Sequence, residues 1–258
     1  MNDSSREEPL LGGNSSISVV RVGATVRRPV ERSTESVNAL LVHFDRLNVA
    51  GVPRFLGYDE RGRQMLTYVE GSANPDPADL TLEDLARVGH LIAALHDAAE
   101  SFVAPEGATW DVVIAPDEST LICHHDLAPW NLVRGAEAMT FIDWNGAGPG
   151  SRLWDLAYAA HGFAPLSPRG ELTLDDAAAR LRALVEGYGL RRHERERLAS
   201  LLAPRVRSMC DLLRSGAGEG REPWVTLVRE RHDTAWLDDA NFIAAHEATW
   251  RAALDVAD

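Results

Sequence analysis

The chain has 258 residues and a formal net charge of −13, and 45% of its residues are hydrophobic. This composition is typical of a globular protein that can bury a substantial core, as one large or two small domains. The acidic balance argues against nucleic acid as a partner, because phosphate backbones are bound by clustered lysine and arginine. It is compatible with a cationic ligand, whose approach an acidic cleft would speed.

Membrane and secretory signals are missing from the pattern of the sequence. No segment approaches the roughly 18 uninterrupted apolar residues of a membrane span, and the first nine residues are polar and acidic rather than basic and then apolar. Cys123 and Cys210 form neither a disulfide framework nor a zinc-ligand pattern. We therefore predict a cytoplasmic protein with no membrane partner.

The front of the chain is predicted to be rich in strands. Residues 1–11 are expected to form a flexible N-terminus, and residues 12–16 (Gly-Gly-Asn-Ser-Ser) a loop of small side chains. Two strands follow, at 17–22 and 25–29, joined by a tight turn at Gly23-Ala24. Such a loop ahead of a hairpin can fold over nucleotide phosphates.

Four residues of this front segment are therefore candidate nucleotide-binding residues. Ser15 and Ser16 would lie in the small-residue loop. Val26 and Arg28 share one face of their strand, because side chains alternate along a strand. Val26 would face the adenine ring and Arg28 the phosphates, with Arg27 as the competing register.

An amphipathic helix and a second hairpin complete the predicted N-terminal lobe. The helix, at about 34–47, has its apolar residues at three-and-four spacing: Val37, Leu40, Leu41, Phe44 and Leu47. Strands at 54–58 and 64–69 flank the turn Asp59-Glu60-Arg61-Gly62. The breaker at 70–75 marks a linker, so the lobes are predicted at 12–71 and 72–258.

The second lobe is predicted to be mainly helical. Thr81 and Asp84 resemble a capping box at the start of a helix that ends near His96. Beyond Leu172, helical patterns cover 177–188, 194–213, 224–237 and 241–254. The glycine-rich residues 216–220 predict a flexible break.

The residues that carry chemistry lie between these helical parts. The segment His124-His125-Asp126-Leu127-Ala128-Pro129-Trp130-Asn131 is followed by Asp143 in Phe141-Ile142-Asp143-Trp144. Asp126 can accept the proton of an attacking hydroxyl, and Asn131 and Asp143 can hold Mg²⁺ that bridges nucleotide phosphates. Strands at 131–133 and 139–142 would form a hairpin that brings Asn131 and Asp143 together. His124 is expected to brace the loop backbone rather than to contact substrate.

The sequence resembles the aminoglycoside phosphotransferase family, within the wider protein-kinase-like group. The resemblance rests on these motifs and on the segment Leu153-Trp154-Asp155-Leu156-Ala157. The resemblance covers about 12–158. It implies an α+β, two-lobe protein-kinase-like fold, with a small antiparallel β lobe containing one helix and a larger, mainly helical lobe. It also implies that Asp126 is the catalytic base, that Asn131 and Asp143 hold metal, and that Asp155 braces the catalytic loop. Residues 67–69, including Thr67 and Val69, would form the hinge whose backbone binds adenine.

Two positions depart from the family's pattern. The family usually pairs a lysine of the third strand with a glutamate of the following helix. This chain has Arg28 or Arg27 in place of the lysine, and Asn38 in place of the glutamate. Arginine stays charged and binds phosphate in a fork, but Asn38 cannot form an ion pair. Glu35, one helical turn earlier, is the alternative partner.

The function expected from these observations is transfer of the γ-phosphoryl group of ATP or GTP, with Mg²⁺, to a hydroxyl of a small molecule. An aminoglycoside-like or other antibiotic is the first candidate acceptor. The alternatives are a kinase of an amino alcohol or sugar metabolite, and a catalytically weak immunity or sequestration protein on the same fold. In the family, acidic residues of the C-terminal helices often bind amino sugars. Asp238, Asp239 and Glu247 lie in that region, but surface carboxylates are usually only solvated, so none is assigned to a site.

Overall fold

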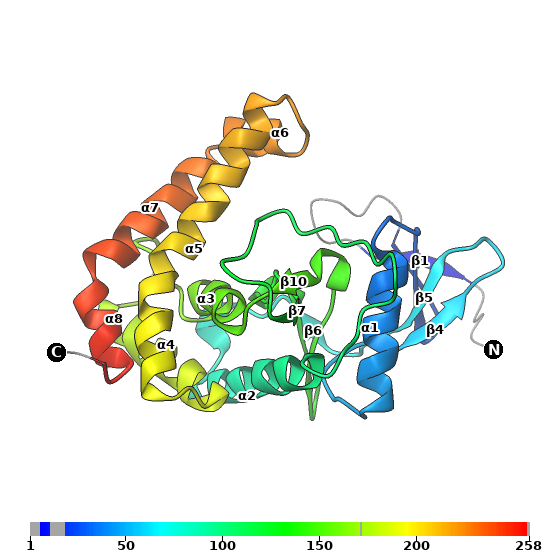
Figure 1. Cartoon of the computed structure of the whole chain (residues 1–258), viewed down its shortest axis with the longest axis horizontal. Coiled ribbons are helices and arrows are strands. Elements are labelled where there is room, and N and C mark those ends of the chain that lie inside the picture. The colour runs from blue at the N-terminus through cyan, green and yellow to red at the C-terminus, as the bar shows by residue number, and fades with distance from the viewer. Residues whose placement is uncertain (1–5, 11–18, 171, 257–258) are drawn as a thin grey trace.

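A computed structural model describes residues 6–10, 19–170 and 172–256. Figure 1 shows a small lobe, built from antiparallel strands and helix α1 (Thr34–Arg46), beside a larger lobe that is mainly helical. The α+β, two-lobe arrangement predicted from the sequence is therefore confirmed.

The sheet of the small lobe has the strand order β1-β2-β3-β5-β4, with antiparallel neighbours. Its strands are β1 (Glu7–Pro9), β2 (Val20–Val22), β3 (Thr25–Arg28), β4 (Phe55–Tyr58) and β5 (Gln64–Thr67). Both predicted hairpins are present, and Gly23 in the first turn has the positive φ of 59° that glycine adopts without steric cost. The α1 helix buries Val37, Leu40, Leu41 and Phe44.

Strand β1 corrects the expectation of a flexible segment over residues 1–11, as far as that segment is described. The backbone of Glu7–Pro9 pairs with β2. The Glu7 carboxylate also lies 3.0 Å from Arg61 and 2.7 Å from Arg63, at the turn of the second hairpin. These ion pairs depend on residues more than 50 positions away, so the local sequence did not reveal them.

The connection between the lobes contains a short strand. Strand β6 (Ser72–Ala73) lies within the predicted linker and pairs with β8 (Leu132–Arg134), which forms the predicted hairpin with β9 (Met139–Phe141). Strand β7 (Leu121–Cys123) pairs with β10 (Gly148–Gly150). The motif residues thus lie between strands of the larger lobe.

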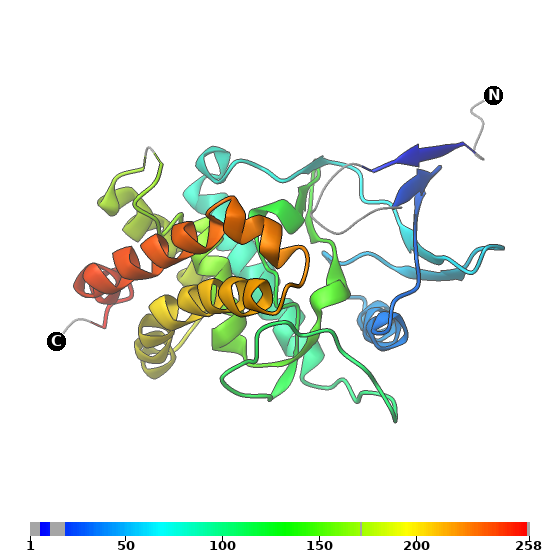
Figure 2. The same cartoon turned by 90° about the horizontal axis from the view of Figure 1, so that it is seen from above.

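The helices of the larger lobe follow in chain order. They are α2 (Leu82–Ala99), α3 (Arg152–Phe163), α4 (Leu174–Tyr188), α5 (Arg192–Gly218), α6 (Trp224–Arg229), α7 (His232–Ala245) and α8 (Glu247–Ala253). The predicted capping box of Thr81 and Asp84 is formed at the start of α2. Figures 1 and 2 show α5 and α7 side by side as an arm with α6 at its tip. Among the described helices, none is long and apolar enough to cross a membrane.

Three boundaries in this region were predicted wrongly. The predicted helix 224–237 is interrupted because Arg231 has a φ of 66°, which a right-handed helix cannot accommodate. The predicted helix 241–254 is divided between α7 and α8, which meet at His246. The α5 helix continues to Gly218, so the glycine-rich segment breaks the chain later than expected.

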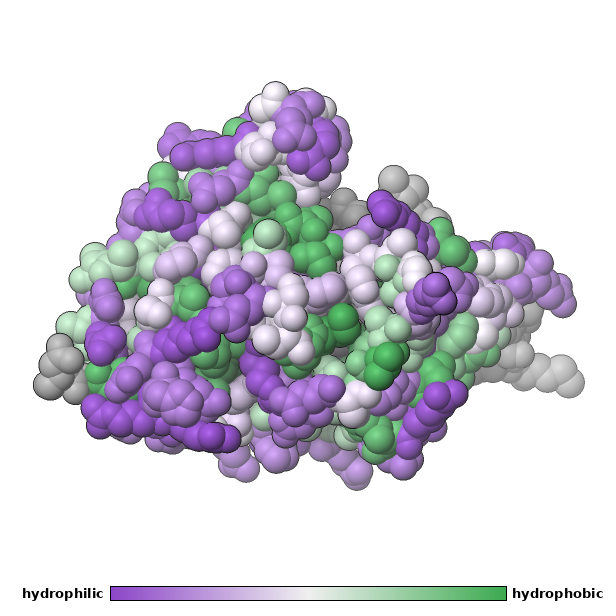
Figure 3. Space-filling view, in the orientation of Figure 1, coloured by the Kyte–Doolittle hydropathy of each residue, from purple (hydrophilic) through white to green (hydrophobic). Residues whose placement is uncertain are grey.

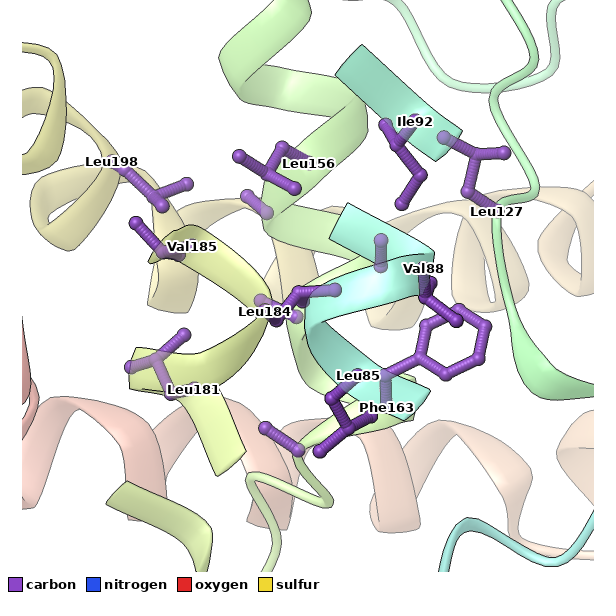
Figure 4. Close-up of a cluster of buried hydrophobic side chains, with 14 of the residues drawn as sticks. Leu85, Val88, Ile92, Leu127, Leu156, Phe163, Leu181, Leu184, Val185 and Leu198 are labelled. Atoms are coloured by element: carbon purple, nitrogen blue, oxygen red, sulfur yellow. The ribbon is translucent and has the colours of Figure 1, made fainter. Parts of the chain in front are cut away.

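The core of the larger lobe supports the motif loop. Figure 4 shows side chains of α2, α3 and α4 packed together with Leu127 from that loop. The labelled members are Leu85, Val88, Ile92, Leu127, Leu156, Phe163, Leu181, Leu184, Val185 and Leu198. Leu127 is 1% exposed. Because Leu127 directly follows Asp126, its burial fixes the neighbouring backbone to the core.

Helices α2 and α4 approach closely at a pair of glycines. A Cβ atom on Gly89 would lie 2.0 Å from the backbone oxygen of Leu184, and one on Gly187 would lie 2.0 Å from that of Ala86. We expect Gly89→Ala to lower the free energy of unfolding by about 3 kcal/mol, because the clash involves backbone and forces the helices apart. Urea unfolding would measure this change.

A matched control for Gly89→Ala lies in another helix. A Cβ atom added to Gly218, at the end of α5, would meet no heavy atom within 4 Å. We expect Gly218→Ala to be neutral or to stabilise by up to about 1 kcal/mol, because alanine has the higher helix propensity. Equal effects of the two substitutions would contradict the close-packing explanation.

Candidate active site

The loop after β7 is held in place by its two histidines. The buried His124 has its ring Nε2 3.0 Å from the carbonyl oxygen of Ile142, and its Nδ1 accepts the backbone N–H of Asp126 at 3.3 Å. His125 has a φ of 67°, and its ring Nε2 lies 3.0 Å from the carbonyl oxygen of Pro149. His124 therefore braces the loop, as predicted from the sequence.

Asp155 on α3 also holds the loop after β7 in place. Its Oδ2 accepts the backbone N–H of His124 at 3.1 Å, and its Oδ1 accepts that of His125 at 2.9 Å. The ring Nε2 of His96 lies 3.2 Å from Oδ2, and the Nδ1 of His96 lies 2.8 Å from the hydroxyl of Tyr188. This carboxylate thus has the bracing geometry that the family resemblance implies.

The environment of Asp155 favours its charged form. Burial opposes ionisation, but the hydrogen bond from His96 and the charges of the surrounding histidines outweigh it, and the pKa of Asp155 falls to about 2. The residue is 1% exposed. A buried carboxylate with three donors is therefore part of the structure that fixes the loop.

Asp126 and Asn131 are in direct contact. The Nδ2 of Asn131 donates to the Oδ2 of Asp126 at 2.7 Å and to its backbone oxygen at 3.0 Å. The proline at the start of the 3₁₀ turn Pro129–Asn131 helps to set this approach. In this contact Asn131 uses its NH₂ group, which leaves its amide oxygen for a cation.

Asp143 lies at the end of the predicted hairpin. The backbone N–H of Ile142 donates to the oxygen of Asn131 at 2.8 Å, so Asp143 is the next residue beyond the position paired with Asn131. Asp143 has φ and ψ of 62° and 62°, the left-handed region, and its side chain is 46% exposed. This conformation is uncommon for a residue with a side chain and is often found at functional sites.

Arg28 connects the two lobes at this point. Its Nη2 lies 3.1 Å from the Oδ1 of Asp143, across 115 positions of sequence. Arg27 points elsewhere, with its Nε 3.7 Å from the Oδ2 of Asp59. Of the two registers left open by the sequence, the structure places Arg28 at the site.

Asn38, which stands where the family has the helix glutamate, makes hydrogen bonds to Tyr58 and Gln64 instead of an ion pair. The Nδ2 of Asn38 donates to the hydroxyl of Tyr58 at 2.8 Å, and the Nε2 of Gln64 donates to Asn38 Oδ1 at 2.5 Å. The hydroxyl of Tyr58 donates to Glu35, and burial together with this hydrogen bond raises the pKa of Tyr58 to about 12. Glu35 therefore pairs with Tyr58 in this structure, and Arg28 pairs with Asp143.

The other predicted nucleotide-binding residues fall into two groups. Val26 is on β3 and packs against the core, and the backbone N–H groups of Thr67 and Tyr68 donate to Arg54 and Ala24. Among the described residues, the N–H of Val69 has no backbone partner. Ser15 and Ser16 lie outside the described residues.

The side of Asp126 away from Asn131 is aromatic, which the sequence analysis did not predict. The Nε1 of Trp130 lies 3.3 Å from both carboxylate oxygens of Asp126. Tyr158 from α3 contacts Trp130 edge to face, at 6.2 Å between centroids, and stacks on Trp236 of α7 at 6.1 Å and 12°. These three residues come from separate elements, so no local motif contains them.

A buried arginine lies against this aromatic group. The guanidinium carbon of Arg205 is 4.3 Å from the ring centroid of Tyr158, and Arg205 Nη2 donates to the backbone oxygen of His125 at 3.3 Å. Arg205 is 1% exposed and shares the buried stripe of α5 with Leu202 and Val206. A charged residue at an apolar stripe position was the signal in the sequence that could have identified it.

The three acidic residues considered in the C-terminal helices have different surroundings. Asp239 is 3% exposed, and its Oδ2 lies 2.6 Å from Arg169 and 3.0 Å from His161. Glu247 lines a shallow pocket beside Pro204 and Trp250. Asp238 is exposed. Asp239 is thus an internal ion-pair residue rather than a solvated one.

The donor set at Asn131 and Asp143 fits magnesium. An amide oxygen and a carboxylate are hard ligands, and Mg²⁺ takes its remaining ligands from phosphate and water. The exposed side chain of Asp143 and the orientation of Asn131 agree with this role. The pairing of Arg28 with Asp143 shows that this carboxylate is within reach of a cation.

Comparison with known proteins identifies the family. The family model described as Phosphotransferase enzyme family, APH, matches residues 18–201. The chain belongs to the phosphotransferase enzyme family. A trifolitoxin immunity protein of Rhizobium leguminosarum bv. trifolii is 30% identical over 274 residues, which cover 98% of this chain and 100% of that protein.

Solved structures of related folds agree with this membership. A choline/ethanolamine kinase family protein from Mesorhizobium loti superposes with a TM-score of 0.57 at 19% identity, covering 99% of this chain and 93% of that one. An amicoumacin kinase in complex with AMP-PNP, Ca²⁺ and Ami gives 0.61 at 12% identity, covering 90% and 86%. These likenesses confirm the protein-kinase-like fold.

Proposed function

We propose that this phosphotransferase family protein transfers the γ-phosphoryl group of ATP or GTP, with Mg²⁺, to a hydroxyl of an antibiotic or other antibacterial toxin. The reaction would take place in the cytoplasm, where the nucleotide is available. One observation carries the proposal: Asn131 contacts Asp126 directly, and the backbone oxygen of Asn131 accepts the N–H of Ile142, the residue before Asp143.

Asp126 is the proposed proton acceptor. The acceptor hydroxyl gives its proton to Asp126 as its oxygen forms a bond to the γ-phosphorus, while the bond from that phosphorus to the β-phosphate oxygen breaks and the nucleoside diphosphate leaves. Asn131 keeps the Asp126 carboxylate oriented through its 2.7 Å hydrogen bond. Bound Mg²⁺, held by Asn131 and Asp143, would neutralise phosphate charge during transfer.

The nucleotide would lie between the lobes. Val26 would contact the adenine or guanine ring, the backbone at Thr67 and Val69 would form the hinge, and Ser15 and Ser16 would cover the phosphates. Arg28 would move from Asp143 to the phosphates when the nucleotide binds, because both are anionic and within reach of its guanidinium.

The first experiment is a mass-spectrometric screen for transfer from magnesium ATP and GTP. The acceptors are aminoglycosides, peptide antibiotics, amino alcohols and sugars, and the control is Asp126→Asn. A phosphorylated antibiotic that disappears in the control supports the proposal. Preferred phosphorylation of an amino alcohol or sugar would assign the protein to metabolism instead. Absence of transfer, together with absence of nucleotide binding, would contradict the enzymatic function.

A second candidate function is immunity by sequestration. It is favoured by the name of the relative that is 30% identical, a trifolitoxin immunity protein, and by the replacement of the usual lysine and glutamate pair by Arg28 and Asn38. Expressing wild type and Asp126→Asn in a toxin-sensitive bacterium separates the two functions. Loss of protection in the variant indicates catalysis, and retained protection indicates sequestration.

The proposed role of Arg28 in nucleotide binding can be tested by comparison with Arg27. We expect Arg28→Gln to weaken the affinity for magnesium nucleotide by about 10- to 100-fold, because a charged hydrogen bond to phosphate is lost. Arg27→Gln is the matched control and should change the affinity less than about twofold, since Arg27 faces Asp59. Titration calorimetry would measure both. A stronger affinity in Arg28→Gln would show that Arg28 competes for Asp143 instead.

A further inference from the structure

Arg205 on α5 carries a buried positive charge that no carboxylate contacts in the described part of the chain. Figure 3 shows strongly hydrophilic residues at the tip and on one side of the arm, where water solvates charge. Arg205 is 1% exposed and lacks that solvation. Asp155 and Asp126 act on it through space, without a hydrogen bond. An unpaired buried charge lowers the stability of a fold, so its presence indicates a role other than packing.

Arg180 on α4 is a buried arginine with a structural role in the same lobe. It is 6% exposed. Its guanidinium donates to three backbone carbonyl oxygens, which join α4 to the segment before α2 and to the end of α3: Leu80 at 2.9 Å, Phe163 at 3.2 Å and Pro77. Arg205 donates to one backbone carbonyl at 3.3 Å and to the hydroxyl of Ser208 at 3.4 Å. These longer contacts contribute less to the packing of the lobe.

The backbone carbonyl that Arg205 contacts belongs to the peptide between His125 and Asp126. The N–H of the same peptide donates to the Nδ1 of His124 at 3.3 Å. Because a peptide is planar, contacts to its carbonyl and its N–H together fix the orientation of the plane. This plane directly precedes the Cα atom of Asp126, so its orientation sets the direction in which the carboxylate points.

His125 requires such contacts because its backbone conformation is uncommon. Its φ is 67°, in the left-handed region that residues with a side chain adopt only when their surroundings hold them there. Asp155 accepts the N–H of His125 at 2.9 Å, and the ring Nε2 lies 3.0 Å from the carbonyl oxygen of Pro149. The N–H and the ring are thus held by α3 and β10, and the carbonyl is held by Arg205 on α5.

Arg205 also lies against the ring of Tyr158. Its guanidinium carbon is 4.3 Å from the ring centroid, within the range of a cation–π contact. Burial and the charge of Asp126 raise the pKa of the Tyr158 hydroxyl well above its usual range, and the charge of Arg205 opposes them. The hydroxyl therefore stays protonated and forms a hydrogen bond with Asp126. Arg205 thus reaches the carboxylate by two routes, through the backbone and through this ring.

We propose that Arg205 is a positioning residue for phosphoryl transfer, which orients the carboxylate of Asp126 by holding the His125 carbonyl and the Tyr158 ring. This inference rests on the proposed function and adds to its site a residue from the arm. Arg205 acts through Asp126 rather than on the acceptor. A base that is oriented before the acceptor binds needs less reorganisation to reach the reactive geometry.

The first measurement compares wild type with Arg205→Met and needs no substrate. Methionine fills a similar space without a charge. We expect the urea concentration at the midpoint of unfolding to stay equal or rise, because an unpaired buried charge is removed. Hydrogen exchange followed by NMR should nevertheless show the Asp126 amide exchanging about tenfold faster, the effect of one lost hydrogen bond on local opening. The amides of α4 should not exchange faster.

Arg180→Met is the matched control, because it makes the same chemical change at another buried arginine. We expect it to lower the urea midpoint, since three carbonyl oxygens lose their donor. It should not accelerate exchange of the Asp126 amide selectively. A lower urea midpoint in Arg205→Met would overturn the proposal, as would exchange of its Asp126 amide at the wild-type rate.

The second measurement is phosphoryl transfer to the acceptor that the screen identifies. We expect Arg205→Met to lower kcat by about 10- to 100-fold, the effect of displacing a catalytic group by about 1 Å. The KM for magnesium nucleotide should change less than about threefold, because Arg205 contacts the loop of the base rather than the proposed metal ligands. Arg180→Met should keep kcat within about threefold of wild type. An unchanged kcat in Arg205→Met would contradict the positioning role.

The two proposals can fail separately. If the wild type neither binds magnesium nucleotide nor transfers a phosphoryl group, the phosphotransferase function has failed. Faster exchange of the Asp126 amide in Arg205→Met would then still show that Arg205 holds the loop. If wild type and Arg205→Met are equally active, the phosphotransferase function stands and the role assigned to Arg205 is wrong.

Discussion

Replacing Asp126 by asparagine should lower the rate of phosphoryl transfer by about 10²- to 10⁴-fold, the usual contribution of a general base. An amide has almost the same shape as a carboxylate and can keep an oxygen opposite the Nδ2 of Asn131, which now donates at 2.7 Å. It cannot accept the proton of the attacking hydroxyl. The measurement is kcat with the acceptor that the screen identifies.

The affinity for magnesium nucleotide distinguishes the role of the proposed base, Asp126, from that of the proposed metal ligands. We expect Asp126→Asn to change the dissociation constant of magnesium nucleotide by less than about threefold, because Asp126 contacts Trp130 and Asn131 rather than the proposed phosphate position. Asp143→Asn serves as the comparison, since it removes a charged metal ligand and should weaken that affinity. Full activity in Asp126→Asn would refute the assignment of the base.

The motif residues could be predicted from the sequence because their spacing is local. Asp126 and Asn131 are separated by one 3₁₀ turn, and Asn131 and Asp143 by one hairpin, so short-range rules fix their relation. The amphipathic pattern of residues 34–47 likewise predicted α1 within one residue of its observed end. Elements whose geometry is determined by neighbouring residues were therefore accessible to sequence reasoning.

The features that could not be predicted from the sequence depend on contacts between distant segments. Arg27 lies against Asp59 and Arg28 against Asp143, and both carboxylates belong to other elements. Arg205 contacts the motif loop across 80 positions. Its place in the apolar stripe of α5 marks it as a buried charge, but its partner lies far away in the sequence. The ring contacts of Tyr158 with Trp130 and Trp236 require α3, α7 and the motif loop to meet, which spacing alone does not encode.

The interruption between α6 and α7 shows a different limit. Residues 224–237 have a helical pattern, but Arg231 adopts a left-handed conformation that ends one helix and begins another. Arginine has no intrinsic preference for that region. The break was therefore not visible in the residues that form it.

Asp155→Asn should be the most destabilising of the substitutions considered, by about 3 kcal/mol or more at pH 7. Both carboxylate oxygens of Asp155 accept a backbone N–H, from His124 and His125, and Oδ2 also accepts from His96. An amide presents one oxygen and one NH₂ group, so one backbone donor would face another donor and remain unsatisfied. Phosphoryl transfer should fall as well, because the loop that positions Asp126 loses its anchor.

The difference in unfolding free energy between wild type and Asp155→Asn should depend on pH, which provides a sharper test. The pKa of Asp155 is about 2 in the folded protein and 3.8 as a free side chain, so the ionised carboxylate stabilises the fold by about 2 kcal/mol. Because the folded value is the lower one, this stabilisation is complete above pH 4 and is lost as the pH falls towards 2.

Urea unfolding of wild type and Asp155→Asn between pH 7 and pH 3 would measure the difference in unfolding free energy. We expect it to shrink below pH 4, as the wild-type carboxylate loses its advantage. Asp111→Asn, at an exposed loop position, is the control and should show little difference at any pH. A difference for Asp155→Asn that does not change with pH would mean that its charge is not what holds the loop, and that the shape of the side chain alone supports the active site.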